Sequence, residues 1–355
     1  MKKTLLTLFA LFVLLLGYLL AWPVPVDTVA WTLPPAPALE GDYAPNTYLA
    51  EVERLDLSSG YGPEDVAVDS LGRIYGGLQD GRILRMQSDG SNAETFADTG
   101  GRPLGLAFDS TGHLIVADAF KGLLSVSPGG EITVLSTEAD GVPFRFTDDV
   151  DIGPDGVIYF SDASSKYDQH HYKWDLVENQ PNGRLLAYDP ATGVTRTLLD
   201  DLYFANGVAV SPDGAFVLVN ETSRYRVRRY WLTGPRHGES EVIIDNLPGF
   251  PDGISSNGAG VYWLALASPR NALLDNLAPH PFVRKMILRL PEALQPAPER
   301  YAFVLGLDAD GRVVHNLQNP SGDPFAIITS VEQVGEVLYL GSLSEPALAR
   351  IAVPE

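Results

Sequence analysis

One strand–turn–strand pattern recurs six times along the chain and limits what the chain can fold into. Each copy has a short apolar strand, a turn that ends in Gly, and a second apolar strand. Asp or Ser in the turn can bond the backbone locally, Pro presets its first position, and Gly accepts the positive φ that closes the hairpin. The copies are Glu64–Tyr75, Leu104–Ile115, Asp148–Tyr159, Asn206–Val217 and, more loosely, Asp252–Tyr262 and Ser330–Tyr339.

Further apolar strands follow each copy. Third strands are expected at Arg82–Met86, Leu123–Val126, Arg184–Tyr188, Arg226–Trp231, Met286–Leu290 and Leu348–Val353. Fourth strands are expected at Asn92–Phe96, Glu131–Leu135, Val194–Leu199 and Glu239–Ile244. Repeated units of four antiparallel strands are typical of propeller blades, so the sequence predicts an all-β, six-bladed β-propeller. The sixth unit lacks an outer strand, and we expect Ala50–Leu55 to supply it and close the ring.

The N-terminus differs from the rest of the chain. Lys2 and Lys3 precede an apolar run that ends at Trp22, long enough to cross a bilayer as a helix. We therefore expect three parts: a membrane anchor over residues 1–22, a Pro/Ala-rich spacer over 23–45, and the propeller over 46–355. The lysines favour a cytoplasmic N-terminus, with the propeller outside the cytoplasm, on the periplasmic or lumenal side. A cleaved signal peptide and a secreted propeller form the alternative.

Composition excludes several kinds of site. The chain has no cysteine, so disulfides, zinc–thiolate sites and cysteine nucleophiles are impossible. Its formal net charge of −20 argues against a nucleic-acid partner, because phosphate binding needs clustered Lys and Arg. The sequence also contains no G-x-S-x-G elbow for a nucleophilic serine.

The residue just ahead of each innermost strand is expected to face the mouth of the central channel. Around the six units this position carries Glu64, Leu104, Asp148, Asn206, Asp252 and Ser330. Carboxylate and amide oxygens without His or Cys form a ligand set for a hard cation, so we predict one calcium ion bound by Glu64, Asp148, Asn206 and Asp252. Asp149 is an alternative third-blade ligand, disfavoured because strand alternation would turn it to the other face. Turn capping explains any single one of these residues equally well.

Two long connections are expected to overhang one face of the propeller. They run from Ser164 to Gly183 and from Ser268 to Lys285, the second continuing to about Pro324. Long loops on a rigid scaffold often form binding sites. Among their aromatic residues, Tyr167, Trp174 and Phe282 are predicted to line a substrate pocket.

Several motifs resemble the strictosidine synthase-like family, over nearly the whole chain. They are Gly101–Gly105, Val116–Gly122, Tyr159–Lys166, Asn206–Val208, Pro248–Asp252 and Leu338–Ser342. Because this family is related to the gluconolactonases and paraoxonases, the resemblance implies a propeller with calcium in its channel and hydrolysis of esters or lactones. It also implies metal ligation by Glu64, Asn206 and Asp252.

The chain departs from its relatives at four places. Asp148 stands where many relatives carry Asn, which adds a negative charge, and Gly253 stands where paraoxonases carry Asn. The segment Ala117–Ala119 lacks the paraoxonase histidine dyad, and Thr329 aligns near the catalytic Glu of true strictosidine synthases. The resemblance therefore implies no strictosidine synthase activity for this chain.

Two functions follow as hypotheses. The first is a calcium-dependent hydrolase that takes a small-molecule ester or lactone, similar to arylesterases and gluconolactonases, with Asp252 or Asp148 activating the attacking water. The second is a membrane-tethered binding propeller in which calcium is only structural. The missing histidine dyad favours the second.

Overall fold

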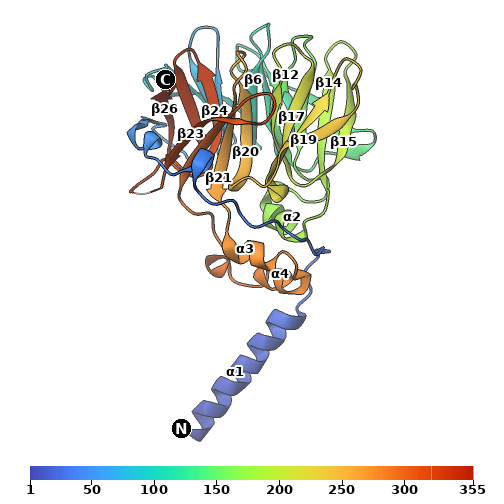
Figure 1. Cartoon of the computed structure of the whole chain (residues 1–355), viewed down its shortest axis with the longest axis vertical. Coiled ribbons are helices and arrows are strands. Elements are labelled where there is room, and N and C mark those ends of the chain that lie inside the picture. The colour runs from blue at the N-terminus through green and yellow to red at the C-terminus, as the bar shows by residue number, and fades with distance from the viewer. Residues whose placement is uncertain (321, 355) are drawn as a thin grey trace.

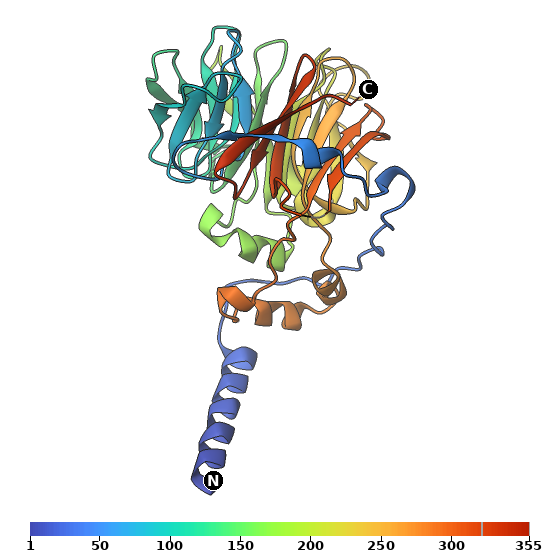
Figure 2. The same cartoon turned by 90° about the vertical axis from the view of Figure 1, so that its left-hand side faces the viewer.

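Six four-stranded antiparallel sheets, the blades, surround a central channel (Figures 1 and 2). The computed structural model describes residues 1–320 and 322–354. The innermost strands contact one another in a closed circle, in the order β2, β6, β12, β16, β20, β24 and back to β2. The hydrophobic core lies between neighbouring blades, where large side chains such as Trp263 are fully buried. The predicted six-bladed propeller is therefore confirmed.

The first three blades have the following strands, from the channel outwards. Blade one contains β2 Val66–Val68, β3 Ile74–Gly77, β4 Arg82–Met86 and β5 Glu94–Asp98. Blade two contains β6 Pro103–Phe108, β7 Leu114–Asp118, β8 Gly122–Val126 and β9 Ile132–Ser136, followed by the small hairpin of β10 Glu138–Ala139 and β11 Val142–Pro143. Blade three contains β12 Thr147–Ile152, β13 Ile158–Asp162, β14 Gly183–Asp189 and β15 Val194–Leu202.

The last three blades complete the circle. Blade four contains β16 Ala205–Val210, β17 Phe216–Glu221, β18 Arg226–Trp231 and β19 Ser240–Ile244. Blade five contains β20 Gly249–Ser256, β21 Tyr262–Pro269, β22 Ala302–Leu307 and β23 Val313–Asn319. Blade six contains β24 Ile328–Val334, β25 Val337–Ser342 and β26 Ala347–Ala352, and its outer strand is β1 Glu53–Asp56.

Strand β1 closes the ring. It pairs antiparallel with β26, so that Leu55 lies opposite Leu348, and both side chains are buried in the same cluster. The expectation that the segment around Ala50–Leu55 supplies the missing strand is confirmed. Pairing the start of the propeller with its end gives blade six four strands, like the other blades, and ties the two ends of the ring together.

The third strand of blade five differs from the prediction. Met286–Leu290 is not a strand: helix α4, Pro281–Ile287, starts with Pro281 at its first turn and runs into this segment. A short apolar run does not distinguish a strand from a buried helix. The true third and fourth strands are β22 and β23, so the insertion is helical and ends before Ala302, well short of Pro324.

Helices cover one end of the propeller. The connection between β13 and β14 forms η3 Gln169–His171 and α2 Tyr172–Glu178, and the connection between β21 and β22 forms α3 Ala272–Leu277, α4 and η5 Glu292–Leu294. We call these elements the helical cap. In Figures 1 and 2 the cap lies between the propeller and the N-terminal helix α1, Lys2–Ala21. Three short 3₁₀ helices, η1 Gly41–Tyr43, η2 Tyr48–Glu51 and η4 Thr222–Arg224, complete the fold.

The segment 23–45 lies against the cap. Val26 is buried, Trp31 N–H donates to the Ala278 carbonyl at 3.1 Å, and Arg284 donates to the Val29 carbonyl at 3.1 Å. This Pro-rich stretch was expected to be a spacer; in the structure part of it is packed onto the folded domain.

Candidate functional site

Five of the six residues predicted for the channel mouth lie together, whereas Ser330 lies deeper in the channel. Two cavities meet there, a channel cavity of about 270 Å³ along the axis and a cap cavity of about 260 Å³ between the mouth and the helical cap. Both are lined by Glu64, Leu104, Asp148, Asn206 and Asp252. These side chains therefore separate the polar channel from the space beneath the cap.

Local irregularities in the innermost strands place these residues. The pairing of β12 with β13 shifts register between Thr147 and Val150, and β20 shifts against β21 between Pro251 and Ile254. Similar shifts occur at the start of β6 and β16. A bulge breaks strict alternation and redirects side chains. Asp149 consequently lines the channel as well, contrary to the prediction that it turns to the other face.

The backbone of Asp252 is positioned by blade four. Asn220, fully buried, donates its side-chain amide hydrogen to the Asp252 carbonyl, and the Thr222 hydroxyl donates to the Pro251 carbonyl at 2.7 Å. A side chain at Gly207 would collide with the Asp252 carbonyl, so glycine is required for this close approach of β16 and β20. The mouth is thus built by contacts between neighbouring blades.

Burial and the neighbouring carboxylates make the ionised forms of the three mouth carboxylates less favourable. Burial raises the pKa of Glu64 to about 7, although Arg102 acts in the opposite direction. Burial, followed by the charges of Glu64 and Asp252, raises the pKa of Asp148 well above its ordinary value. Burial and the charge of Glu64 likewise raise the pKa of Asp252, against the hydrogen bond from Asn206. A cation among them would relieve this repulsion.

Arg102 is the functional residue that the sequence analysis missed. Its side chain is fully buried, donates to the Gly77 carbonyl at 3.0 Å, and has its Nη2 atom 3.6 Å from Oε2 of Glu64. It comes from blade two, whose mouth residue Leu104 carries no charge. The only signal was a charged residue directly before Pro103 and the innermost strand of that blade.

The donor set fits a divalent cation. If all three carboxylates are ionised, they and the Arg102 guanidinium leave two uncompensated negative charges at the mouth, and Oε2 of Glu64 is buried without a hydrogen-bond partner. Among the described residues, no three His, Cys, Asp or Glu side chains form a metal site by themselves. Calcium takes six to eight oxygens in flexible geometry, so the Asn206 amide, water or substrate would complete its coordination.

Deeper in the channel, carboxylates connect the blades. Asp65 accepts from the Leu106 N–H at 2.8 Å, Asp149 from the Val208 N–H at 2.7 Å, and Asp151 from the Val210 N–H at 2.7 Å. Each bond joins one innermost strand to the next. These hydrogen bonds give Asp149 a structural role, distinct from that of Asp148 at the mouth.

Glu332 also lines the channel, and its pKa tests whether the channel is shielded from water. Burial, with the nearby Asp65 and Asp151, raises its pKa to about 8, whereas a glutamate in an unfolded chain ionises near pH ~4.3. The unfolded state therefore releases a proton that the folded state keeps, and stability falls as pH rises between these two values. We expect Glu332→Gln to raise the urea midpoint of unfolding more at about pH 8 than at about pH 5. An equal change at both pH values would contradict this account.

The cap cavity has mainly aromatic and aliphatic walls. Phe146, Phe204, Tyr225 and Phe250 contribute from the propeller, Tyr172, Leu176, Leu274 and Ile287 from the cap, and Trp31 and Leu33 from the segment 23–45. Away from the mouth, charged side chains in its wall have partners in the protein. Arg284 donates to two backbone carbonyls, Lys173 pairs with Glu292, and Asp275 pairs with Arg270.

The three aromatic residues predicted for this pocket do not line it. Tyr167 is buried, and its hydroxyl contacts Glu178 and the Pro25 carbonyl. Trp174 packs on His171 with ring centroids 4.3 Å apart, and Phe282 is 53% exposed. Helical geometry explains the difference, because Tyr172 and Leu176, four residues apart in α2, share the face that meets the cavity. No histidine among the described residues lines either cavity.

Comparisons with known proteins agree with this architecture. Family models for strictosidine synthase and for the strictosidine synthase-like N-terminal region match residues 148–235 and 41–86. Strictosidine synthase-like protein 4 of Arabidopsis thaliana is 39% identical over 335 residues, 92% of this chain and 88% of the relative. The human adipocyte plasma membrane-associated protein is 35% identical over 364 residues, 96% of this chain and 86% of the relative.

Solved structures with the same fold are more distant in sequence. A gluconolactonase from Xanthomonas campestris superposes with a TM-score of 0.61 at 16% identity, covering 94% of this chain and 99% of that one. The calcium-binding protein regucalcin from Agrobacterium tumefaciens gives 0.60 at 16% identity, covering 84% and 92%. These likenesses concern the fold, whereas the curated relatives cover nearly all of the sequence. The chain belongs to the strictosidine synthase-like family.

Proposed function

We propose that the protein is a calcium-dependent hydrolase of carboxylic esters or lactones. The observation that carries the proposal is the convergence of Glu64, Asp148, Asn206 and Asp252 where a polar channel meets an apolar cavity. The acidic mouth suits a cation and the reacting carbonyl, and the apolar cap cavity suits the rest of an ester. The gluconolactonase and regucalcin structures, one a lactonase and the other calcium-binding, support this assignment.

The four mouth residues would bind the ion and orient the substrate. A bound calcium would supply Lewis-acid polarisation of the carbonyl. Asp148 or Asp252 would accept a proton from the attacking water as its oxygen bonds to the acyl carbon. The same carboxyl would return that proton to the leaving oxygen as the ester bond breaks.

Hydrolysis is tested with a panel of aryl esters and lactones. We expect turnover in calcium, loss after chelation, and recovery when calcium but not magnesium is added back, because calcium accepts irregular sets of oxygen ligands whereas magnesium demands near-octahedral geometry. Absence of turnover both with and without calcium would contradict the hydrolase assignment.

The competing function is a binding propeller with a structural calcium. Among the described residues, no histidine lines either cavity, so the site lacks the commonest general base, which favours this second function. Strictosidine synthase activity is not proposed, because Thr329 aligns near the catalytic Glu of true strictosidine synthases. In this chain the Thr329 hydroxyl donates to the Glu64 carbonyl at 2.6 Å.

Helix α1 is proposed as a membrane anchor. It is the one helix among the described residues that is long and apolar enough to cross a bilayer, and none of it is buried. Its lysines favour a cytoplasmic N-terminus and a propeller outside the cytoplasm. The alternative is a cleaved signal sequence, and the intact mass of the mature protein distinguishes the two.

A further inference from the structure

The helical cap is fixed to the end of α1. Arg289, which follows α4 and is 7% exposed, donates from Nε to the Trp22 carbonyl at 2.7 Å and from Nη1 to the Leu19 carbonyl at 2.8 Å. These carbonyls belong to the unsatisfied C-terminal end of the helix. A cation at this end is also favoured by the helix dipole. The cap therefore lies where α1 ends.

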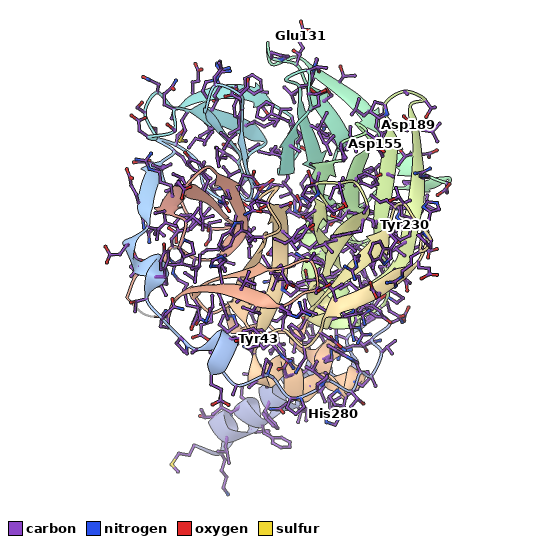
Figure 3. All side chains as sticks on the ribbon, turned by 45° about the horizontal axis from the view of Figure 1, so that its top comes forward. Tyr43, Glu131, Asp155, Asp189, Tyr230 and His280 are labelled. Carbon is purple, nitrogen blue, oxygen red and sulfur yellow. The ribbon has the colours of Figure 1, made fainter. Side chains whose placement is uncertain are left out.

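A helix of 20 residues is about 30 Å long, which matches the hydrocarbon thickness of a bilayer. If α1 spans the membrane as proposed, its end at Ala21 and Trp22 lies at the lipid–water boundary. The cap then lies at the same depth. Figure 3 shows His280, which precedes α4, on the side where α1 leaves, and Asp155, in the β12–β13 turn, on the far side of the propeller.

The cap exposes large apolar side chains. Leu273 on α3 and Phe282 and Val283 on α4 are 55%, 53% and 39% exposed, and Leu294 on η5 is 68% exposed. None of the four lines the cap cavity. Their neighbours Leu274 and Ile287 do line it, so the same short helices present one apolar face to the cavity and another to the outside. An outward apolar face beside a spanning helix is typical of an element that lies in a membrane surface.

We propose that the outer face of the cap lies in the lipid surface, and that the cap cavity takes the hydrocarbon chain of a membrane-dissolved ester or lactone. The proposal rests on the proposed anchor and deepens the proposed function by naming its substrate class. The polar head of such an amphiphile would meet the acidic mouth while its chain contacts Phe204, Leu176 and Ile287. A lipid-facing cap would let it reach the cavity without crossing water.

Contact with lipid is tested by site-specific labelling. The chain has no cysteine, so Phe282→Cys gives a single attachment site for an environment-sensitive fluorophore. The matched control is Leu71→Cys, which is equally apolar and 74% exposed in the β2–β3 turn, at the channel end opposite the mouth. The full-length protein is reconstituted in phosphatidylcholine vesicles that carry a lipid-attached quencher.

We expect blue-shifted, quenched emission from the label at position 282 and water-like emission at position 71. Equal water exposure at the two positions would overturn the membrane contact. The double variant Leu273→Ser/Leu294→Ser is expected to shift the label at position 282 towards water while leaving the Leu71→Cys signal unchanged.

The hydrocarbon-chain site is tested with ligands that cannot be hydrolysed. Calorimetry on the wild-type protein would measure the Kd of methyl ketones of increasing chain length. Each added methylene is expected to lower Kd about fourfold until the cavity is full. A Kd independent of chain length would overturn the substrate class. Both experiments measure contact or binding, so their failure is distinguishable from failure of the ester panel, which measures turnover.

Discussion

Asp252→Ala is expected to abolish both calcium binding and ester hydrolysis while the propeller remains folded. Asp252 lines both cavities, and its carboxylate is one of three that face the proposed ion. Removing an ion ligand that also serves the reaction is expected to weaken calcium affinity about 100-fold or more and to lower kcat/KM about 1,000-fold. The carbonyl of residue 252 keeps its bond from Asn220 and that of Pro251 its bond from Thr222, so the blade contacts persist.

The matched control for this variant is Ser330→Ala. Ser330 lies in the innermost strand of blade six, one residue after the position equivalent to Asp252; it lines the channel cavity but not the cap cavity and carries no carboxylate. Calcium titration by calorimetry, ester kinetics and far-ultraviolet circular dichroism are measured on both variants. A folded Asp252→Ala protein that binds calcium as tightly as the wild type would show that the ion, if present, is bound elsewhere.

Arg102→Met is expected to make the calcium-free protein strongly unstable and more dependent on calcium. The substitution leaves Glu64 without its buried cationic neighbour, and the Gly77 carbonyl without its donor. Breaking a buried charge pair typically costs about 3–5 kcal/mol. Because the mouth then carries one more uncompensated negative charge, added calcium should restore more stability than it adds to the wild type.

Thermal unfolding with calcium and with chelator measures this effect. Arg102→Lys is the conservative comparison, since it keeps the charge but loses the planar donor geometry, and we expect an intermediate loss. A chelated Arg102→Met protein as stable as the chelated wild type would show that Arg102 does not offset the mouth carboxylates.

The blades were predictable because their signals are local. Hairpin turns such as that at Asp69–Gly72 are indicated by Asp, Ser and Gly at fixed positions. Because the pattern occurs six times, a weak copy can be recognised by comparison with the others. The closing strand followed from a count of strands in the sixth unit. The error at Met286–Leu290 arose where the repeat is interrupted, since a five-residue apolar run fits a helix as well as a strand.

The mouth residues were predictable for a related reason, because the repeat gives each blade an equivalent position. Arg102 was not, since it lies outside that position and reaches Glu64 only through the fold. The cavity walls were also missed. Trp31 and Leu33 come from a segment whose Pro content indicates a spacer, and only tertiary contacts with Ala278 and Arg284 show that it packs on the cap. Long-range packing leaves no pattern in the sequence.

The central claim is that a calcium ion binds at the channel mouth. Elemental analysis of the full-length protein, purified in detergent without chelator, tests it most directly. We expect one calcium ion per chain in the wild type and in Ser330→Ala, and none in Asp252→Ala. Zinc in place of calcium, or no bound metal in the wild-type protein, would contradict the account.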